Sequence, residues 1–161
     1  MVAQYVMVED ASITISIDSP AVLVAGPIAH SLEVSSSGKI TVDTKKVAIG
    51  SDMSSQNPKT GLAYTNTPYV TPGVLTWDGV LSGFSIATKL KKDGSGVVLD
   101  TNGGTVNFNV TTPAINPSPP GSNDPASSYS GTWSINNAGQ IKLDVDEGWV
   151  QIQTILDMGM V

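Results

Sequence analysis

Apolar and polar residues alternate strictly in several short stretches of the chain. Residues 11–17 place Ile13, Ile15 and Ile17 on one face and small polar side chains on the other, and residues 39–43 alternate in the same way. A period of two is typical of strands with one buried and one solvated face, and β-branched residues favour strands over helices. The pattern therefore predicts an all-β fold built from short strands and hairpins.

The stretch over residues 69–112 has the most regular pattern. Residues 97–99 are apolar, residues 100–104 are turn formers, and residues 105–110 alternate, which predicts a strand, a glycine turn and a second strand. Residues 86–92 are compatible with a strand or a short helix, and the glycine-rich turn that follows favours a strand leading into a hairpin.

Other parts of the chain have the composition of connections. Turn formers dominate residues 51–67, which predicts a long loop. Pro, Ser and Asn dominate residues 113–130, which is typical of an extended linker outside the core. Residues 131–143 then predict a separate hairpin, and residues 144–161 predict a helix, although residues 149–155 also alternate as a strand would.

These patterns predict three parts. A β domain covers residues 1–112, a linker covers residues 113–130, and a small C-terminal extension with a hairpin and a short helix covers residues 131–161. A chain of 161 residues is long enough to bury a core without covalent cross-links.

Composition excludes several kinds of chemistry. The chain has no cysteine, so it forms neither disulfides nor thiolate metal sites. Its net charge is −6 and its eight basic residues are all lysines, clustered only at Lys45-Lys46 and Lys89-Lys91-Lys92, which disfavours nucleic-acid binding. The first residues lack a Sec-type signal peptide and no apolar run approaches the roughly 20 residues of a membrane span, so a soluble protein is expected.

Candidate reactive residues are few, and none is predicted to be catalytic, metal-binding or cofactor-binding. His30 is the only histidine, and no Gly-x-Ser-x-Gly motif singles out a serine nucleophile. The acidic run Asp144, Asp146 and Glu147 lacks the spacing of a calcium loop. Three tryptophans could stack on a glycan, but core packing is the expected role of each: Trp77, Trp133 and Trp149.

The order of the segments resembles one known arrangement. A Gly-Lys-Ile-x-x-x-Thr-Lys-x-x-x-x-Gly stretch spans residues 38–50, a proline-rich segment reaches Trp77 over residues 68–77, and residues 86–110 hold a strand, Leu-Asp, Gly-Gly and an alternating strand. Over residues 2–112 this order is similar to the PAAR-like proteins, the tips that cap the spikes of type VI secretion systems, contractile injection particles and phage tails.

The resemblance implies a β-rich cone whose flat base of strand edges docks on a trimeric, VgrG-like spike. It also implies that the C-terminal extension carries or recruits an effector. Members of the family often ligate zinc near the apex through Cys or His, and here Tyr69 stands where a cysteine is common. The resemblance therefore implies a tip held by side-chain packing, without the metal.

Three hypotheses follow. The first is a non-enzymatic spike tip that is made in the cytoplasm and then becomes part of an assembled or secreted particle. The second is a β-sandwich adhesin or tail-fibre module that binds a glycan through exposed tryptophans. The third is a small hydrolase that uses His30.

Overall fold

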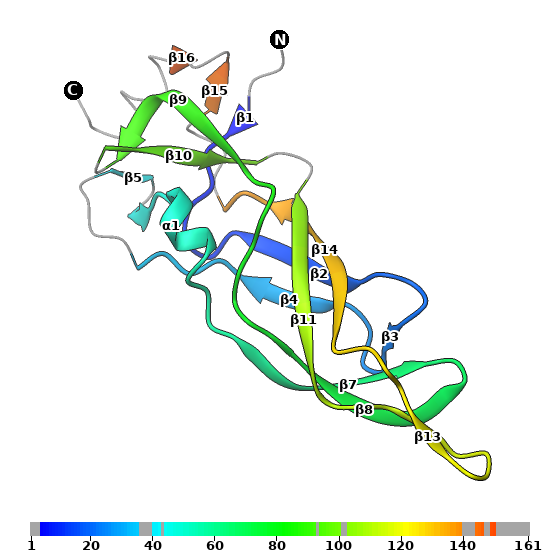
Figure 1. The fold of residues 1–161 in the computed structure, drawn as a ribbon. Helices are drawn as coiled ribbons and strands as arrows, with labels where there is room; N and C mark the ends of the chain where they lie inside the picture. The colour runs from blue at the N-terminus through cyan, green and yellow to red at the C-terminus, as the bar shows by residue number, and fades with distance from the viewer. Residues whose placement is uncertain are drawn as a thin grey trace.

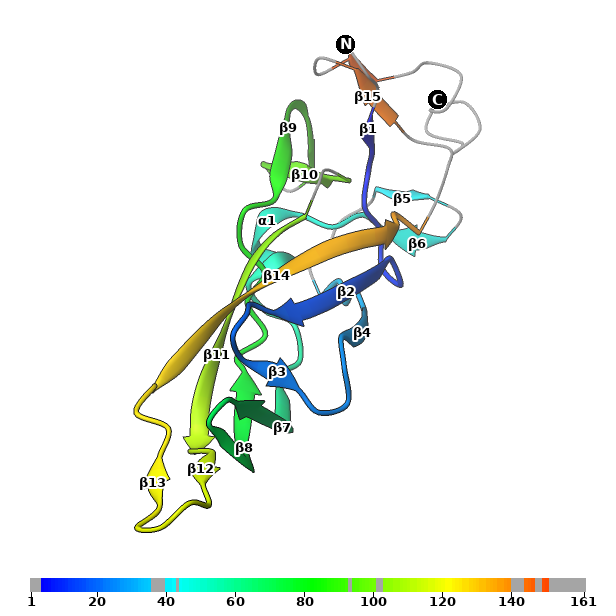
Figure 2. The same cartoon turned by 90° about the vertical axis from the view of Figure 1, so that its right-hand side faces the viewer.

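The computed structural model describes residues 4–35, 40–42, 44–92, 94–100, 103–139, 144–146 and 149–150. These residues form an elongated, tapering body, wide at one end and narrow at the other (Figures 1 and 2). Almost all of the regular structure is strand, and all pairings between named strands are antiparallel. The prediction of an all-β fold is confirmed.

One curled sheet runs along the length of the body (Figure 1). Its strands occur in the order β13-β12-β8-β11-β14-β2-β4, and β7 pairs with both β8 and β3. The bounds are β2 (Ser12–Ile17), β3 (Val22–Leu23), β4 (Ile28–Ser31), β7 (Lys59–Asn66), β8 (Tyr69–Trp77), β11 (Gly104–Thr112), β12 (Ile115–Asn116), β13 (Ser122–Asn123) and β14 (Ser128–Asn137). The predicted strand over residues 11–17 is thus confirmed as β2.

The inner face of this sheet holds the main core. Alternate residues of β2, β11 and β14 point inward, so that Ile13 and Ile15 pack with Phe108 and Trp133. The outward positions of the same strands are small and polar. Strand alternation alone thus accounts for the burial of this face.

Short elements make up the wide end. They are β1 (Gln4–Tyr5), β5 (Thr41–Val42), β6 (Lys45–Lys46), α1 (Gly50–Met53), β9 (Ser85–Lys92), β10 (Ser95–Leu99), β15 (Asp144–Asp146) and β16 (Trp149–Val150). The strand expected over residues 39–43 corresponds in part to β5. The strand expected over residues 86–92 is β9, and it pairs with β10 as the predicted hairpin.

The long loop predicted over residues 51–67 is wrong. This segment contains most of α1 and the whole of β7. A two-residue turn at Thr67-Pro68 folds β7 back on β8, and this pairing places Tyr64 fully inside the core. The segment lacks strict alternation, so only its tertiary partner makes it a strand.

The predicted hairpin between residues 97–99 and 105–110 is also corrected. Both stretches are strands, but β10 pairs with β9, whereas β11 pairs with β8 and β14. Gly103, at φ +86°, lies directly before β11, where a Cβ would come 1.9 Å from the carbonyl oxygen of Trp133. The glycines thus allow close packing against β14, and do not join two paired strands.

The structure does not separate a linker and a C-terminal hairpin from the rest. The segment over residues 113–130 contains β12 and β13 and buries Ala114 and Asp124. β14, expected as half of a separate hairpin, lies between β11 and β2 in the main sheet. The other half, residues 140–143, lies outside the described residues.

The helix expected over residues 144–161 is corrected where the structure describes that segment. β15 and β16 are paired strands, and of the alternative strand over residues 149–155 the structure describes residues 149–150, which form β16. Residues 151–161 lie outside the described part of the chain.

Gly131 provides a test of this packing. It lies at the centre of β14, where a Cβ would come 2.3 Å from the carbonyl oxygen of Ser16 and 2.7 Å from the ring of Phe108. Gly131→Ala should therefore lower the free energy of unfolding by about 2 kcal/mol through overpacking. Chemical denaturation measures this, with Ser134→Ala on the exposed face of the same strand as the control. Equal midpoints for the two variants would contradict the described sheet.

Candidate functional site: a three-fold ring at the wide end

Three short apolar segments meet inside the wide end. We call residues 6–8 the first arm, residues 47–49 the second arm and residues 97–99 the third arm; their sequences are Val-Met-Val, Val-Ala-Ile and Val-Val-Leu. All nine side chains are buried. Consecutive apolar residues, in contrast to alternating ones, suit strands that are covered on both faces.

Backbone hydrogen bonds join the central residues of the arms in a cycle. The N–H of Met7 donates to the carbonyl oxygen of Val98, that of Val98 donates to Ala48, and that of Ala48 donates to Met7, each at 2.9 Å. Each arm therefore donates to one neighbour and accepts from the other. We call this arrangement the three-fold ring.

The flanking residues of the arms repeat the same cycle. The first residue of each arm lies opposite the last residue of another, in the antiparallel pairs Val6 with Leu99, Val47 with Val8, and Val97 with Ile49. Exchanging the arms in cyclic order leaves this pattern unchanged, so the ring has three-fold symmetry in its connections although one chain makes all of it.

Two further bonds extend the cycle. Glu9 follows the first arm, and its N–H donates to the carbonyl oxygen of Lys46, just before the second arm, at 2.9 Å. Asp100 follows the third arm, and its N–H donates to the carbonyl oxygen of Tyr5, just before the first arm, at 2.8 Å. Burial raises the pKa of the Asp100 carboxyl, although hydrogen bonds from the N–H groups of Tyr5 and of Asp100 itself lower it.

Each arm leads outward into a two-strand ladder, and the three ladders share one register. The residue before each arm is paired as Tyr5 with Asp144, Lys46 with Thr41, and Gly96 with Lys91. One position further out the pairs are Gln4 with Val145, Lys45 with Val42, and Ser95 with Lys92. Figures 1 and 2 show the ladders β1/β15, β5/β6 and β9/β10 grouped at the wide end.

The connections between the two strands of the β5/β6 and β9/β10 ladders are also similar. In each, a two-residue loop joins the last pair, and its second residue has positive φ: 68° at Thr44 and 78° at Gly94. Two-residue loops of this kind match the twist of paired strands. The strand pair in the first ladder is different, because β1 and β15 come from opposite ends of the chain.

A second, smaller core stabilises the ladders. It draws side chains from all three arms, from β5 and from β9: Val6, Val8, Val42, Val47, Ala87, Val97 and Leu99. Lys92 occupies the register position that Val42 holds in the β5/β6 ladder, and it is only 2% exposed. Its Nζ donates to the carbonyl oxygen of Val47 at 2.8 Å, which ties the third ladder to the second arm.

The remaining candidate residues lie elsewhere. His30 is buried in the main core, where its Nε2 lies 2.9 Å from Oε1 of Gln56 and its ring meets Trp77 edge-on at 5.2 Å. The amide of Gln56 donates to the carbonyl oxygens of Glu33 and Asp52. His30 is therefore a packed core histidine, which removes the residue on which the hydrolase hypothesis depended.

Two of the three tryptophans are core residues. Trp77 and Trp133 are at most 1% exposed, and their indole N–H groups donate to the carbonyl oxygens of Val80 and Ser82. Neither can stack on a glycan, and the side chain of Trp149 lies outside the described residues. Over the described ranges no group of three His, Cys, Asp or Glu side chains could hold a metal ion.

A polar network holds together the opposite, narrow end. The buried carboxylate of Asp124 accepts hydrogen bonds from the hydroxyls of Tyr64 and Tyr129 and from the N–H of Ala126. The N–H of Ala114 in turn donates to the hydroxyl of Tyr64 at 3.1 Å. These bonds join the β12–β13 segment to β7 and β14.

The network shifts the pKa values of its members. Burial tends to raise the pKa of Asp124, but hydrogen bonds from Tyr129, Ala126 and Tyr64 lower it below its ordinary value. Burial, together with the Asp124 carboxylate, raises the pKa of Tyr64 and raises that of Tyr129 to about 12. The stable state of the network is thus one carboxylate and two neutral phenols.

The comparison with known families agrees with this architecture. The family described as contractile injection system spike tip protein matches residues 2–151. The chain belongs to this family. The resemblance to spike-tip proteins is therefore confirmed, and the chain acts as part of an injection particle. No curated protein matches the sequence, and among the described residues of this spike-tip protein no helix is long and apolar enough to cross a membrane.

The sequence pattern located the arms only in part. The apolar run at residues 97–99 predicts a strand, whereas the other two arms, residues 6–8 and 47–49, have no period that singles them out. A usable signal is the shared form of the arms: a valine begins each apolar triplet, and an acidic residue or glycine follows it.

Lys92 allows a test of the ring. Lys92→Ala should lower the free energy of unfolding by about 2–3 kcal/mol, because it removes a charged hydrogen bond to Val47 and leaves a void. Urea denaturation of the spike-tip protein measures this, and Lys91→Ala, at an exposed position one residue away, should cost much less. Similar losses from both variants would show that the ammonium does not tie the ladder to the second arm.

The tyrosine–aspartate network predicts an alkaline weakening. Between pH 10 and about 12 unfolded chains release the Tyr129 proton while the folded protein keeps it, so stability falls as pH rises. Tyr129→Phe should reduce the slope of unfolding free energy against pH in this window by up to about 1.4 kcal/mol per pH unit. Tyr69→Phe serves as the control. An unchanged slope in Tyr129→Phe would argue against the network.

Proposed function

We propose that this chain caps the three-fold end of a trimeric spike, with the wide end against the spike and the narrow end pointing away from it. The observation that carries the proposal is the three-fold ring together with its three ladders in one register. The family match supports a place at the tip of an injection particle.

The physical argument concerns symmetry. A trimer presents three identical chain ends around an axis, whereas a single chain has no symmetry of its own. A single chain binds such an end best when it offers three equivalent sets of contacts, because heterologous surfaces would leave two of the three chain ends without a partner. The three ladders supply such sets, since each leaves its arm at the same position.

The contacts at this end would be made by backbone edges and small side chains. Thr44, Gly94 and Ser95 are exposed at the ends of two ladders. Strand edges bind other strands through regular hydrogen bonds without needing a specific side chain. This mode fits a protein that acts by shape, and we propose that the role is structural and not enzymatic, because His30 and the described tryptophans serve the core.

Effector recruitment is the second part of this proposal. Among the described strands, β16 lies at the edge of the sheet β1-β15-β16. An effector strand could pair there, outside the ring. The chain would be synthesised in the cytoplasm and loaded on the spike before the particle is used.

Mass measurement tests the capping proposal. Mixed with the spike trimer encoded beside it, the protein should form a complex of one chain per trimer. Ser95→Trp, at the end of the third ladder, should weaken the complex about tenfold by steric block, whereas Ser122→Trp at the narrow end should not. The absence of any complex at micromolar concentration, or a defect only in Ser122→Trp, would refute the proposal.

A further inference from the structure

A polar cavity lies on the outer face of the long sheet. It has a volume of about 370 Å³, which is enough to hold a small ligand. Its walls come from the residues that follow β2 and β8 and from the outward positions of β11 and β14. The side chains that matter here are Asp18, Asp78, Val80, Thr105, Asn107 and Ser130.

The register of the sheet places four of these side chains in one row across the strands. Asp18 lies beside Ser130, because its N–H donates to the carbonyl oxygen of Ser130 at 3.0 Å. Ser130 pairs with Asn107. Asp78 directly follows Trp77, the last residue of β8, which pairs with β11. Since neighbouring strands are about 4.8 Å apart, the row presents a carboxylate, a hydroxyl, an amide and a second carboxylate at regular intervals.

The polar groups of this row are accessible to a ligand. All four side chains are exposed. Within the described part of the chain, no protein group forms a hydrogen bond with the Asp18 carboxylate or the Ser130 hydroxyl. The Asn107 amide donates to Asn109 at 3.3 Å, and the Asp78 carboxylate accepts the N–H of Val80 at 3.1 Å. Each side chain therefore keeps donors or lone pairs for further hydrogen bonds.

The chemistry of the cavity indicates an uncharged ligand with many hydroxyl groups. Carboxylate, amide and hydroxyl side chains form directional hydrogen bonds with such groups. No lysine is among the described residues that line the cavity, so its two carboxylates repel acidic ligands. Val80 is half-buried and adds an apolar contact next to Asp78. An acetamido group fits this pair, because its N–H donates to a carboxylate while its methyl group packs on a valine.

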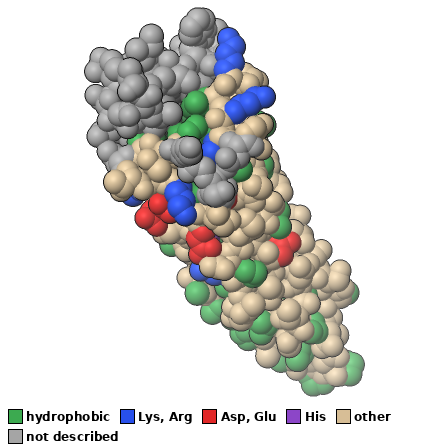
Figure 3. Space-filling view, turned by 90° about the vertical axis from the view of Figure 1, so that its left-hand side faces the viewer, with side chains coloured by type: hydrophobic (Ala, Val, Ile, Leu, Met, Phe, Trp, Pro, Cys, Tyr) green, Lys and Arg blue, Asp and Glu red, His purple; other side chains and the backbone are tan. Residues whose placement is uncertain are grey.

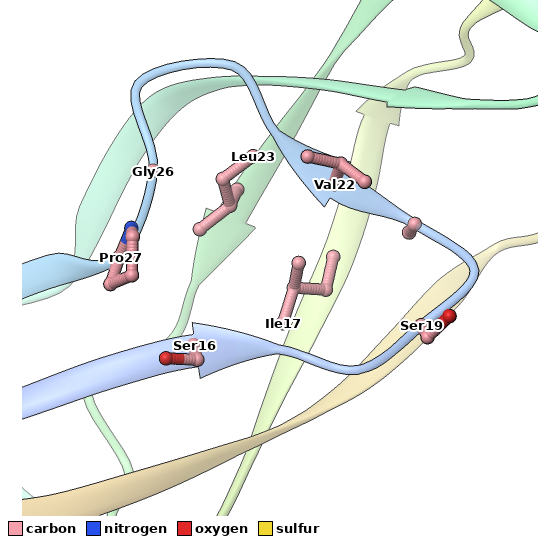
Figure 4. A pocket seen from close by; sticks show the side chains of 8 residues that line it. Ser16, Ile17, Ser19, Val22, Leu23, Gly26 and Pro27 are labelled. Carbon is pink, nitrogen blue, oxygen red and sulfur yellow. The ribbon is translucent and has the colours of Figure 1, made fainter.

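The position of the cavity separates it from the apolar surface of the narrow end. Asp18 and Asp78 border two segments without charge, residues 19–29 and 60–76, and in Figure 3 the charged side chains on the visible face stop about half-way along the body. A second cavity, of about 250 Å³, lies between the end of β2 and the β3 loop. Its lining is mostly apolar (Figure 4), so it does not offer the same hydrogen bonds.

We propose that the polar cavity binds an uncharged saccharide that carries an acetamido group. The sugar hydroxyls donate to the carboxylates of the row, and Asn107 and Ser130 both donate to them and accept from them. No stacking on tryptophan is involved, since Trp77 and Trp133 are buried in the core. This inference goes beyond capping, because the cavity lies outside the ladders of the wide end and the isolated chain should bind the sugar.

Titration calorimetry with the trimer of N-acetylglucosamine tests the proposal. The unmodified chain should bind this sugar, and Asn107→Leu should weaken binding about tenfold, because it removes a donor and an acceptor from the centre of the row. Asn109→Leu is the matched control and should leave binding unchanged. Both residues are exposed on the same face of β11, and both variants lose the hydrogen bond between them, but Asn109 does not line the cavity.

Sialyllactose is the acidic counterpart, since it carries both an acetamido group and a carboxylate. The unmodified chain should not bind it, whereas the double variant Asp18→Asn with Asp78→Asn should, because the repulsion is gone and each amide keeps an acceptor. Absence of binding at millimolar N-acetylglucosamine trimer, equal losses in Asn107→Leu and Asn109→Leu, or equally tight binding of sialyllactose by the unmodified chain would overturn the proposal. Val22→Ser, at the apolar cavity, should leave sugar binding unchanged. Asn107→Leu should still cap the spike trimer, so a failure of sugar binding is distinguishable from a failure of capping.

Discussion

The structure depends on the cycle of backbone hydrogen bonds among Met7, Ala48 and Val98. Each of these residues comes from a different region of the sequence, so closing the cycle fixes the N-terminal segment, the second arm and β10 against one another. Because the bonds use only backbone atoms, the side chains are free to differ in size between the arms. The ring is therefore a constraint on chain path, and the two cores form on either side of it.

The ring also separates two environments with opposite requirements. Beyond it, the ladders carry Lys45, Lys46, Lys89 and Lys91, and the described side chains there are largely polar or charged. On the other side, residues 19–29, 60–76 and 107–130 of the narrow end contain one charged residue, Asp124, whose carboxylate accepts hydrogen bonds from two phenols. A docking surface benefits from polar groups that align a partner. The wide end thus suits the docking role proposed for it.

Much of the fold could be predicted from local pattern, because strands such as β2 and β11 alternate over their length and need no information about their partners. Pairing could not be predicted in this way. β10 and β11 follow each other across a glycine turn, yet they separate because β10 belongs to the ring and β11 to the main sheet. β7 was missed because its residues do not alternate, and only pairing with β8 makes it a strand. The C-terminal region was misjudged for the same reason: β14 takes its place from two distant strands.

The candidate site illustrates a harder limit. Three-residue apolar runs have no period, and they occur in any core, so no arm stands out by itself. What distinguishes them is that three such runs have equivalent partners, and this is a property of the folded chain. Even in the folded chain the symmetry is incomplete, since Lys92 occupies in the β9/β10 ladder the position that Val42 occupies in the β5/β6 ladder. A buried ammonium at one ladder only makes the three ladders chemically distinguishable while their backbones stay alike. A tip built in this way can meet three identical spike chains through its backbone and still keep a single internal packing.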